Sequence, residues 1–470
     1  MAVLHRAAAP TTRPRTGTAG ARGRTARRDA GVRLAAGVVL WASLLVVSYW
    51  WVAGGNVQQL VTWPDGLAAA GRLLGLVASD LLLVQVLLMA RVPVLEAAFG
   101  QDRLAVLHRW TGFTSFTLVL AHVVLTTWGY AAGSPAAFVP TLWLLTRTYP
   151  GMLLAVAGSI ALVAVTVTSI RWARRRLRYE SWHLLHLYAY LGVGLALPHQ
   201  LWTGQDFGSV TATDAWWTAW ALTAATVLGC RVGLPLWRSA RHRLRVTSVV
   251  PEAPGIVSVS LTGHRLDRLR VHAGQFFVWR FLGREGWTQG HPYSLSSAPD
   301  GRSLRITFRI PDGDRTAARE VRRGARVLLE GPYGRLSPRV RTRDRVLLVG
   351  AGVGVTPLRA LAQELDYRWG DAVLLQRCRA RPLFAEELRT LTRERGLQVV
   401  TLPGERTPGS WLPAGAHPGD DLSALLDWVP DAAERDAYLC GPDEWTAAVR
   451  RTLLAAGTPV DQIHVESFGW

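Results

Sequence analysis

Apolar residues are concentrated in the first half of the chain, where six long segments alternate with short polar loops. Each segment can cross a bilayer, because about 20 helical residues span roughly 30 Å of hydrocarbon. Tryptophans stand near many segment ends, as in the aromatic belts of membrane interfaces. The pattern therefore predicts six transmembrane helices, over Val32–Val52, Leu67–Ala90, Leu104–Trp128, Met152–Ile170, His183–Trp202 and Trp216–Trp237.

From Arg241 the pattern becomes that of a water-soluble protein. Short alternating strands with Gly and Pro between them predict a small β-barrel up to about Arg343. Strands then alternate with helices, which predicts an α/β domain with a doubly wound parallel sheet. The expected domains are a disordered Arg-rich tail (1–30), a six-helix transmembrane bundle (31–240), a β-barrel domain (241–343) and the α/β domain (344–470).

The formal net charge of +19 would suit a nucleic-acid binder, but the placement of the arginines argues against one. They gather in the N-terminal tail and in the loop Arg171–Arg178, and both flank apolar spans. The positive-inside rule places both segments in the cytoplasm, and six crossings return the C-terminal half to the same side. We therefore expect a multi-pass protein of a bacterial cell membrane, with cytoplasmic termini, a lipid bilayer as its surroundings and no nucleic-acid partner.

The cysteines exclude two kinds of site. Cys230, Cys378 and Cys440 lie far apart and form no CxxC pair. They cannot supply a four-cysteine iron–sulfur cluster within this chain, and they give no disulfide framework.

Two of the predicted spans carry pairs of histidines. His108 and His122 are 14 residues apart, which places them about 21 Å apart along a helix and within about 40° on its face. His186 and His199 are 13 residues apart, or about 20 Å. Paired across the two spans, these imidazoles form two sites at two depths, which suits two bis-histidine haems. Zinc fits poorly, because further ligands are lacking.

One feature of the second pair needs a local distortion. On a straight helix His186 and His199 point about 140° apart. A bulge or kink at Gly192, Gly194 or Pro198 could re-aim one of them. His183 is the alternative to His199, and for any single histidine a hydrogen bond between helices is the alternative to metal binding.

The soluble half contains a series of short motifs. The barrel region holds His291-Pro292-Tyr293-Ser294, then Gly313-Asp314-Arg315-Thr316 and Gly331-Pro332-Tyr333-Gly334. The strand Arg345–Val349 runs into the glycine turn Gly350–Pro357 and a helix, which lets a pyrophosphate approach backbone amides at a positive helix end. Later strands end in Arg377–Arg381 and in Cys440-Gly441-Pro442.

In this order the motifs resemble the ferredoxin–NADP reductase superfamily. Joined to the membrane half, the chain resembles the NADPH oxidase and ferric reductase family of membrane flavocytochromes over about residues 31–470. The resemblance implies a dehydrogenase with an FAD-binding barrel and an NADPH-binding α/β domain. It also assigns the four haem-ligating histidines to His108, His122, His186 and His199.

The resemblance implies roles for single residues in the FAD site. Tyr293 would stack on the flavin, Ser294 would hydrogen-bond near its reactive nitrogen, and His291 would lie near the phosphates. Phe468 would cover the flavin, although Trp470 extends the chain beyond that aromatic. The other residues expected around FAD are Pro292, Arg309, Gly313, Thr316, Gly331 and Gly334.

Further assignments concern the nicotinamide nucleotide. Arg377 and Arg379 follow the second strand of the α/β domain, where they suit a 2′-phosphate, and no acidic residue stands there to hold an NAD ribose. NADPH is therefore the expected donor. The pyrophosphate turn would comprise Gly350, Gly352, Gly354, Thr356 and Pro357, and Cys440, Gly441 and Pro442 would lie beside the nicotinamide.

The expected activity is transmembrane electron transfer from NADPH through FAD and two b-type haems to an acceptor on the far face. In the first hypothesis the acceptor is oxygen, which is reduced to superoxide. In the second hypothesis the acceptor is a ferric complex or another redox partner. A haem-free bundle that anchors a flavin reductase is the third interpretation. None needs a catalytic acid, base or nucleophile, because the cofactors supply the chemistry.

Overall fold

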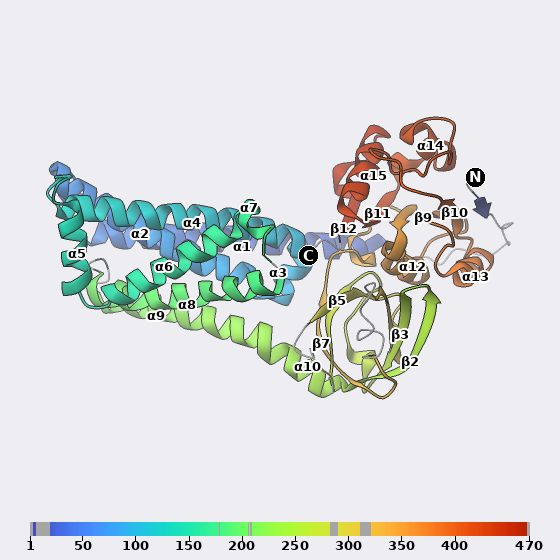
Figure 1. The fold of residues 1–470 in the computed structure, drawn as a ribbon, viewed down its shortest axis with the longest axis horizontal. Helices are drawn as coiled ribbons and strands as arrows, with labels where there is room; N and C mark the ends of the chain where they lie inside the picture. The colour runs from blue at the N-terminus through green and yellow to red at the C-terminus, as the bar shows by residue number, and fades with distance from the viewer. Residues whose placement is uncertain are drawn as a thin grey trace. The chain divides into compact units, whose positions relative to one another are not determined.

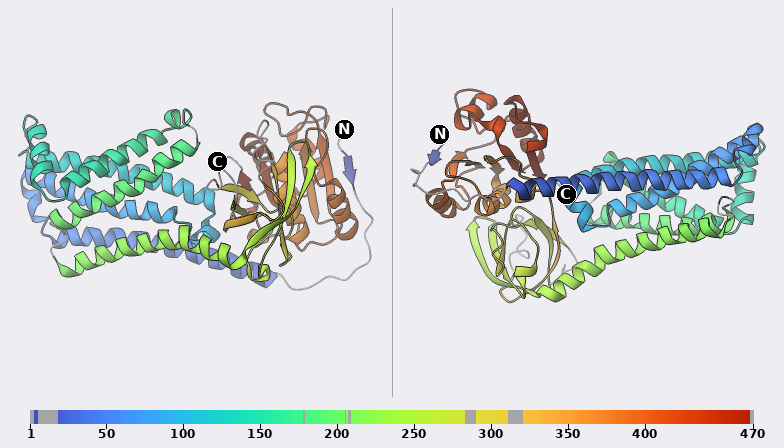
Figure 2. Two further views of the ribbon diagram at one scale, coloured as in Figure 1. Left: turned by 60° about the horizontal axis from the view of Figure 1, so that its bottom comes forward. Right: turned by 180° about the vertical axis from the view of Figure 1, so that it is seen from behind.

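The computed structural model describes residues 3–5, 19–177, 179–204, 206, 209–282, 290–310 and 321–467. The chain divides into two compact units (Figures 1 and 2). The helical unit comprises Val32–Leu95 and Asp102–Arg231, and the sheet unit comprises Met1–Gly31, Glu96–Gln101 and Val232–Trp470. The three boundaries between the four expected domains remain predictions.

The helical unit is built of long helices that run side by side (Figure 1). Short elements connect them: η1 (Gln58–Val61), α3 (Pro93–Phe99), α5 (Phe138–Thr148) and α7 (Arg171–Arg174). After the last long helix come a π-helical turn (Gly229–Gly233) and α10 (Leu234–His242). The long helices are α1 (Ala19–Ala53), α2 (Trp63–Leu88), α4 (Gln101–Tyr130), α6 (Met152–Ser169), α8 (Tyr179–Thr203) and α9 (Val210–Leu228).

Within the described residues, five helical stretches are long and apolar enough to cross a membrane: Thr25–Ala53, Trp63–Leu88, Gln101–Tyr130, Met152–Ser169 and Val210–His242. The fifth predicted crossing also forms a helix, α8, but it is not among these five. Its three histidines and Gln200 lower its mean hydropathy. The count of six membrane crossings therefore stays a prediction.

Glycines bring pairs of helices into close contact. A Cβ atom on Gly71 of α2 would lie 2.4 Å from Oγ1 of Thr126 on α4, and one on Gly158 of α6 would lie 2.6 Å from the carbonyl oxygen of Gly192 on α8. Small residues allow such approaches between membrane helices. As a result α4 packs on α2, and α8 packs on α6.

The first residues of the chain carry two elements where the sequence predicts a disordered tail. Strand β1 (Val3–His5) pairs antiparallel with β10 of the parallel sheet, and α1 begins at Ala19. Alanine and arginine are both good helix formers, so an Ala- and Arg-rich segment can extend the helix that follows it.

The first sheet of the sheet unit is antiparallel, with six described strands in the order β5-β4-β7-β2-β3-β6. An isolated bridge between Leu295 and Ile306 connects the end of β5 to β6. Phe277, Trp279 and Ile306 lie fully buried in its core. A closed barrel stays a prediction. The strands are β2 (Leu244–Ala253), β3 (Ile256–Thr262), β4 (Phe276–Phe281), β5 (His291–Ser294), β6 (Ser303–Arg309) and β7 (Arg326–Tyr333).

The second sheet has the order β1-β10-β9-β8-β11-β12, and all of its described strands except β1 are parallel to their neighbours. Separate apolar clusters cover its two faces, which confirms the predicted α/β parallel sheet. Its strands are β8 (Val346–Ala351), β9 (Ala372–Cys378), β10 (Gln398–Pro403), β11 (Asp436–Gly441) and β12 (Ile463–Ser467). Its helices are α12 (Val355–Glu364), α13 (Ala385–Arg395), α14 (Asp421–Trp428) and α15 (Asp443–Ala455).

Candidate functional site: paired histidines and a nucleotide-binding turn

The first histidine pair joins α4 and α8. The ring centroids of His108 and His186 lie 6.0 Å apart, with an angle of 64° between the ring planes. Two imidazoles that bind one metal from opposite sides, at about 2 Å each, place their centroids roughly 6 Å apart. Nδ1 of His108 lies 2.9 Å from the carbonyl oxygen of Gln85, and Nδ1 of His186 lies 3.3 Å from Oγ of Ser169. Because a carbonyl only accepts, His108 donates from Nδ1 and keeps the lone pair of Nε2 for a metal.

The second pair joins the same two helices at another depth. His122 donates from Nδ1 to the carbonyl oxygen of Gly71 over 2.8 Å. Gly75 makes room for this ring, since a Cβ there would lie 2.6 Å from Nδ1 of His122. His199 is buried, lies within electrostatic reach of His122 and is hydrogen-bonded to the backbone of Ala196.

The depth of each pair is set by α2. The carbonyls that orient His122 and His108 belong to Gly71 and Gln85, which are 14 residues apart on one helix. That spacing is about 21 Å along the axis. Among the described residues, no group of three or more His, Cys, Asp and Glu side chains could hold a metal. The histidines lie in pairs at two levels, an arrangement compatible with the bis-histidine haem sites expected from the sequence.

The distortion expected in α8 does not interrupt the helix. The helix runs without a break from Tyr179 to Thr203 and contains Pro198. Gly151 of the preceding segment packs against this region, because a Cβ on it would lie 2.7 Å from the backbone nitrogen of His199. The kink itself stays a prediction. His183, the alternative ligand, lies within electrostatic reach of Arg231 and His186.

The His-Pro-Tyr-Ser motif forms β5 and pairs with β4, with Tyr293 opposite Phe277. Tyr293 stacks on Phe308, with centroids 4.2 Å apart and planes at 5°, and it lies parallel to His291 at 5.9 Å. Ser294 is buried, and its hydroxyl has no hydrogen-bond partner among the described residues. A buried hydroxyl of this kind suits the hydrogen bond to the flavin that the resemblance implies.

The other residues expected around FAD are placed in part. Gly331 and Gly334 take φ angles of +134° and +88°, which side chains rarely adopt, at the end of β7. Arg309 is exposed at the end of β6. Gly313, Thr316 and Phe468 lie outside the described residues.

The glycine turn lies where the order of the parallel sheet reverses. Strands β8 and β11 are neighbours, and from them the chain continues to opposite edges of the sheet, to β9 and β10 on one side and to β12 on the other. Ligands of doubly wound sheets bind at such a point. A Cβ on Gly354 would lie 2.2 Å from the carbonyl oxygen of Cys440. Thr356, with Pro357 in the first turn of α12, donates its hydroxyl to the carbonyl of Val353. The turn and the Cys-Gly-Pro motif therefore form one surface at the N-terminus of α12.

Cys440 is fully buried at that surface, between Gly350 of β8 and Glu466 of β12. Burial, with the nearby Glu466 carboxylate, raises the pKa of the Cys440 thiol well above its usual range. This cysteine therefore stays a neutral thiol and contributes to the site through its packing. Gly441 is equally close-packed, because a Cβ there would lie 2.8 Å from Cε3 of Trp445.

The arginines expected to hold a 2′-phosphate differ in their surroundings. Arg377 is half-buried, burial lowers its pKa, and its Nε has no hydrogen-bond partner among the described residues. Arg379 is exposed and lies 4.0 Å from the carboxylate of Glu405. Glu405 is not an expected site residue, because β10 was not predicted from the sequence. The end of β10 brings Glu405 and Arg406 beside the end of β9. An acidic side chain thus does stand near this site.

Comparisons with known proteins divide the chain in the same way. Residues 74–197 match the family described as "Ferric reductase like transmembrane component". The ferredoxin reductase component of 3-ketosteroid-9-alpha-monooxygenase from Mycolicibacterium smegmatis is 32% identical over 239 residues, covering 48% of this chain and 65% of the relative. A flavohemoprotein from Chromobacterium violaceum is 30% identical over 286 residues, covering 54% of this chain and 69% of the relative. A solved structure, the ferredoxin reductase in carbazole 1,9a-dioxygenase, is 24% identical with a TM-score of 0.38, covering 48% of this chain and 69% of that chain.

Together, the transmembrane match and the reductase relatives place a ferric reductase-like membrane domain and a ferredoxin reductase-like domain in one chain. The chain belongs to the ferric reductase and NADPH oxidase type, in which a ferric reductase-like transmembrane domain is fused to a ferredoxin reductase-like domain. The chain spans 65% of the length of the first of these relatives.

Proposed function

We propose that this protein carries electrons across a membrane, from cytoplasmic NADPH through FAD and two b-type haems to oxygen on the opposite face, where superoxide forms. When bound, FAD converts a hydride from the nicotinamide into single electrons, and the haems carry those electrons one at a time. The observation that carries the proposal is the histidine arrangement. His108 of α4 and His186 of α8 have the 6.0 Å centroid separation that suits a shared metal. His122 and His199 of the same two helices lie within electrostatic reach of each other.

The chain's own residues bind and orient these groups. The carbonyls of Gln85 and Gly71 hold the tautomers of His108 and His122, which keeps Nε2 of each ring unprotonated. Ser294 offers its buried hydroxyl to the flavin. The amides at the start of α12 and the positive helix end attract the pyrophosphate of the nucleotide.

Haem binding is tested with the purified full chain and its reduced-minus-oxidised absorption spectrum. His122→Leu should lower the haem content while NADPH-driven dye reduction continues, because the dehydrogenase residues are untouched. His183→Leu tests the alternative ligand: full haem content assigns the fourth position to His199, and loss of haem assigns it to His183. Unchanged haem in His122→Leu would contradict the ligand assignment, and a wild-type protein without a haem spectrum would leave a flavin reductase with a membrane anchor.

The preference for NADPH is tested at Arg377. Arg377→Gln removes a half-buried cation whose Nε lacks a partner among the described residues, so KM for NADPH should rise while KM for NADH stays within twofold. The exposed Arg381 is the matched control, and Arg381→Gln should change neither value. Equal effects on both nucleotides would show that Arg377 does not read the 2′-phosphate.

The acceptor is tested by steady-state NADPH oxidation with superoxide trapping, with and without a ferric chelate. Trapped superoxide that accounts for the NADPH consumed supports oxygen. NADPH oxidation that depends on the chelate supports a ferric reductase, which is the activity named by the transmembrane match.

A further inference from the structure

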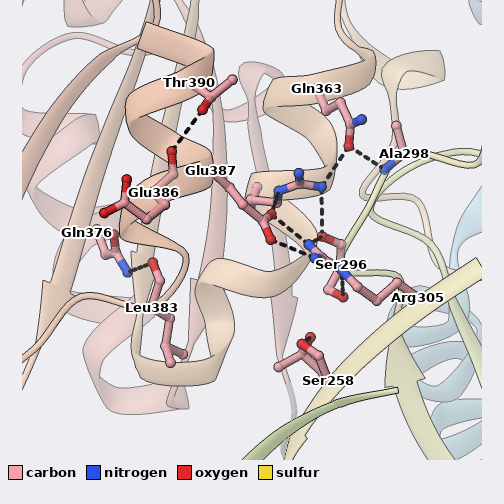
Figure 3. A network of polar contacts seen from close by, with 12 residues as sticks. Ser258, Ser296, Ala298, Arg305, Gln363, Gln376, Leu383, Glu386, Glu387 and Thr390 are labelled. Carbon is pink, nitrogen blue, oxygen red and sulfur yellow. Dashed lines mark hydrogen bonds and ion pairs between the residues drawn. The ribbon is translucent and has the colours of Figure 1, made fainter. Parts of the chain in front are cut away.

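A group of polar side chains joins the antiparallel sheet to the parallel sheet within the sheet unit (Figure 3). Arg305 of β6 donates from Nη1 and Nη2 to the two carboxylate oxygens of Glu387 on α13, over 2.6 and 2.8 Å. Nε of Arg359 on α12 lies 2.6 Å from the same carboxylate. We name Arg305, Glu387 and Arg359 the Arg–Glu–Arg clamp.

Both arginines of the clamp also hold the segment that follows β5. Arg305 donates to the carbonyl of Ser296 over 3.0 Å and to its hydroxyl over 3.1 Å. Arg359 donates to the same carbonyl over 3.2 Å and to Oε1 of Gln363 over 2.6 Å. That oxygen of Gln363 in turn accepts from the backbone of Ala298 over 3.0 Å. The segment is therefore fixed from both domains at once.

The clamp lies between the flavin motif of β5 and the glycine turn that precedes α12. Ser296 follows Ser294, the buried hydroxyl of the flavin motif, by two residues. Arg359 lies four residues after Val355, where α12 begins beyond the glycine turn. The path from the flavin motif to the pyrophosphate turn therefore runs through Ser296, the carboxylate of Glu387 and one turn of α12.

The Glu387 carboxylate and the Arg359 guanidinium of the clamp are both charged at neutral pH. Burial acts to raise the pKa of the Glu387 carboxyl, but the hydrogen bonds from Arg305 and the charge of Arg359 hold that pKa below its usual value. Burial lowers the pKa of Arg359 to about 10, which still leaves it protonated. The exposed fractions of the three side chains are only 19%, 32% and 10%. Removing one partner would leave an uncompensated charge in this place, so the clamp favours a single arrangement of the two domains.

Each domain has a hydrophobic core that does not include the clamp. Phe277 and Trp279 belong to the core of the antiparallel sheet, and Leu348 and Leu361 belong to the core of the parallel sheet. The cluster around the parallel sheet also includes Ile256, Ala273 and Leu336 of the antiparallel half, so an apolar contact holds the two halves together beside the clamp. The clamp adds a polar contact that orients one half against the other.

We propose that the Arg–Glu–Arg clamp positions the nicotinamide against the flavin, so that its residues set the rate of hydride transfer without touching either group. This inference rests on the proposed function of the sheet unit as an NADPH dehydrogenase. Misplacement of reacting groups by 1 Å costs about 100-fold in rate. A change in domain arrangement of that size should therefore slow hydride transfer while each cofactor still binds.

The test uses the full-length holoenzyme and the variant Glu387→Gln, which removes the charge and keeps the shape. The measured quantities are the FAD content, the rate of flavin reduction by NADPH in a single turnover, and the charge-transfer absorbance between nicotinamide and flavin. We expect full FAD content, a reduction rate lowered about 10- to 100-fold, and a weaker charge-transfer band. Glu386→Gln is the matched control, because Glu386 neighbours Glu387 and is ion-paired to Arg389 at 2.6 Å but is 80% exposed. It should stay within twofold of wild type.

A second variant keeps the test decisive if Glu387→Gln does not fold. Arg305→Lys retains the charge but loses the two-pronged contact, so it should give a smaller loss of rate with a weakened charge-transfer band. Wild-type rates and bands in the folded variants would overturn the proposal, and so would a loss of rate that only follows a loss of FAD. If the wild-type flavin is not reduced by NADPH, the proposed function fails, whatever the clamp variants do.

Discussion

The sharpest test of the nucleotide-binding surface is Gly354→Ala. The new Cβ would lie 2.2 Å from the carbonyl oxygen of Cys440, 2.6 Å from its carbonyl carbon and 2.9 Å from the amide nitrogen of Gly441. All three are backbone atoms, so no side-chain rotation can relieve the clash, and the end of β11 must move away from the turn. Overpacking of this kind costs about 1–3 kcal/mol. If this cost destabilises the arrangement of the turn that binds the nucleotide, the affinity for NADP⁺ drops by roughly 5- to 150-fold, since 1.4 kcal/mol corresponds to a factor of ten.

The assay is titration of the purified full chain with NADP⁺, together with FAD and haem content. We expect the dissociation constant for NADP⁺ to rise within that range while haem content stays at the wild-type level, because the helical unit is unchanged. Gly229→Ala is the control, since a Cβ there meets nothing within 4 Å and its φ of −62° is ordinary. NADP⁺ affinity within twofold of wild type for Gly354→Ala would refute the inference that the turn and the Cys-Gly-Pro motif form one binding surface.

Three further outcomes follow from the structure. Gly75→Val should lower the haem content, because the Cβ position lies 2.6 Å from Nδ1 of His122 and the new side chain would displace that ring. Gly194→Ala is the control and should keep the haem content, since a Cβ there meets nothing within 4 Å. Equal haem spectra for the two variants would contradict this prediction. Cys440 should resist alkylation at pH 8, because burial raises its pKa, while the half-buried Cys230 reacts faster; mass spectrometry of the modified peptides measures both. Burial acts to raise the pKa of the Asp431 carboxyl, but hydrogen bonding from Arg435 outweighs burial and lowers that pKa below 3.8. The ionised carboxylate therefore stabilises the fold above that pH, and this stabilisation is lost as the pH falls below it. Asp431→Asn should therefore lower the thermal unfolding midpoint at pH 7, and the difference from wild type should shrink in acid.

The features that depend on near neighbours in the chain could be read from the sequence. Five of the six apolar spans, the parallel strands at Val346–Ala351 and Asp436–Gly441 and the glycine turn are local patterns of period and composition, and the structure forms them near the expected residues. The histidine spacing predicted two levels from helix geometry alone, and the carbonyls of Gly71 and Gln85 place His122 and His108 at two such levels.

Other features depended on contacts between distant residues. Nothing near Arg305 in the sequence indicates that its partner is Glu387, 82 positions away, or that β10 brings Glu405 beside Arg379. The buried hydroxyl of Ser294, which has no hydrogen-bond partner among the described residues, likewise could be recognised only from the packing of the surrounding elements. Sequence alone determined the long apolar helices and the strands beside the glycine turn, because those follow short-range periodicity, whereas β1 and β10 were not predicted. Only the tertiary structure decided which charges and hydrogen-bonding atoms meet, because that depends on long-range packing.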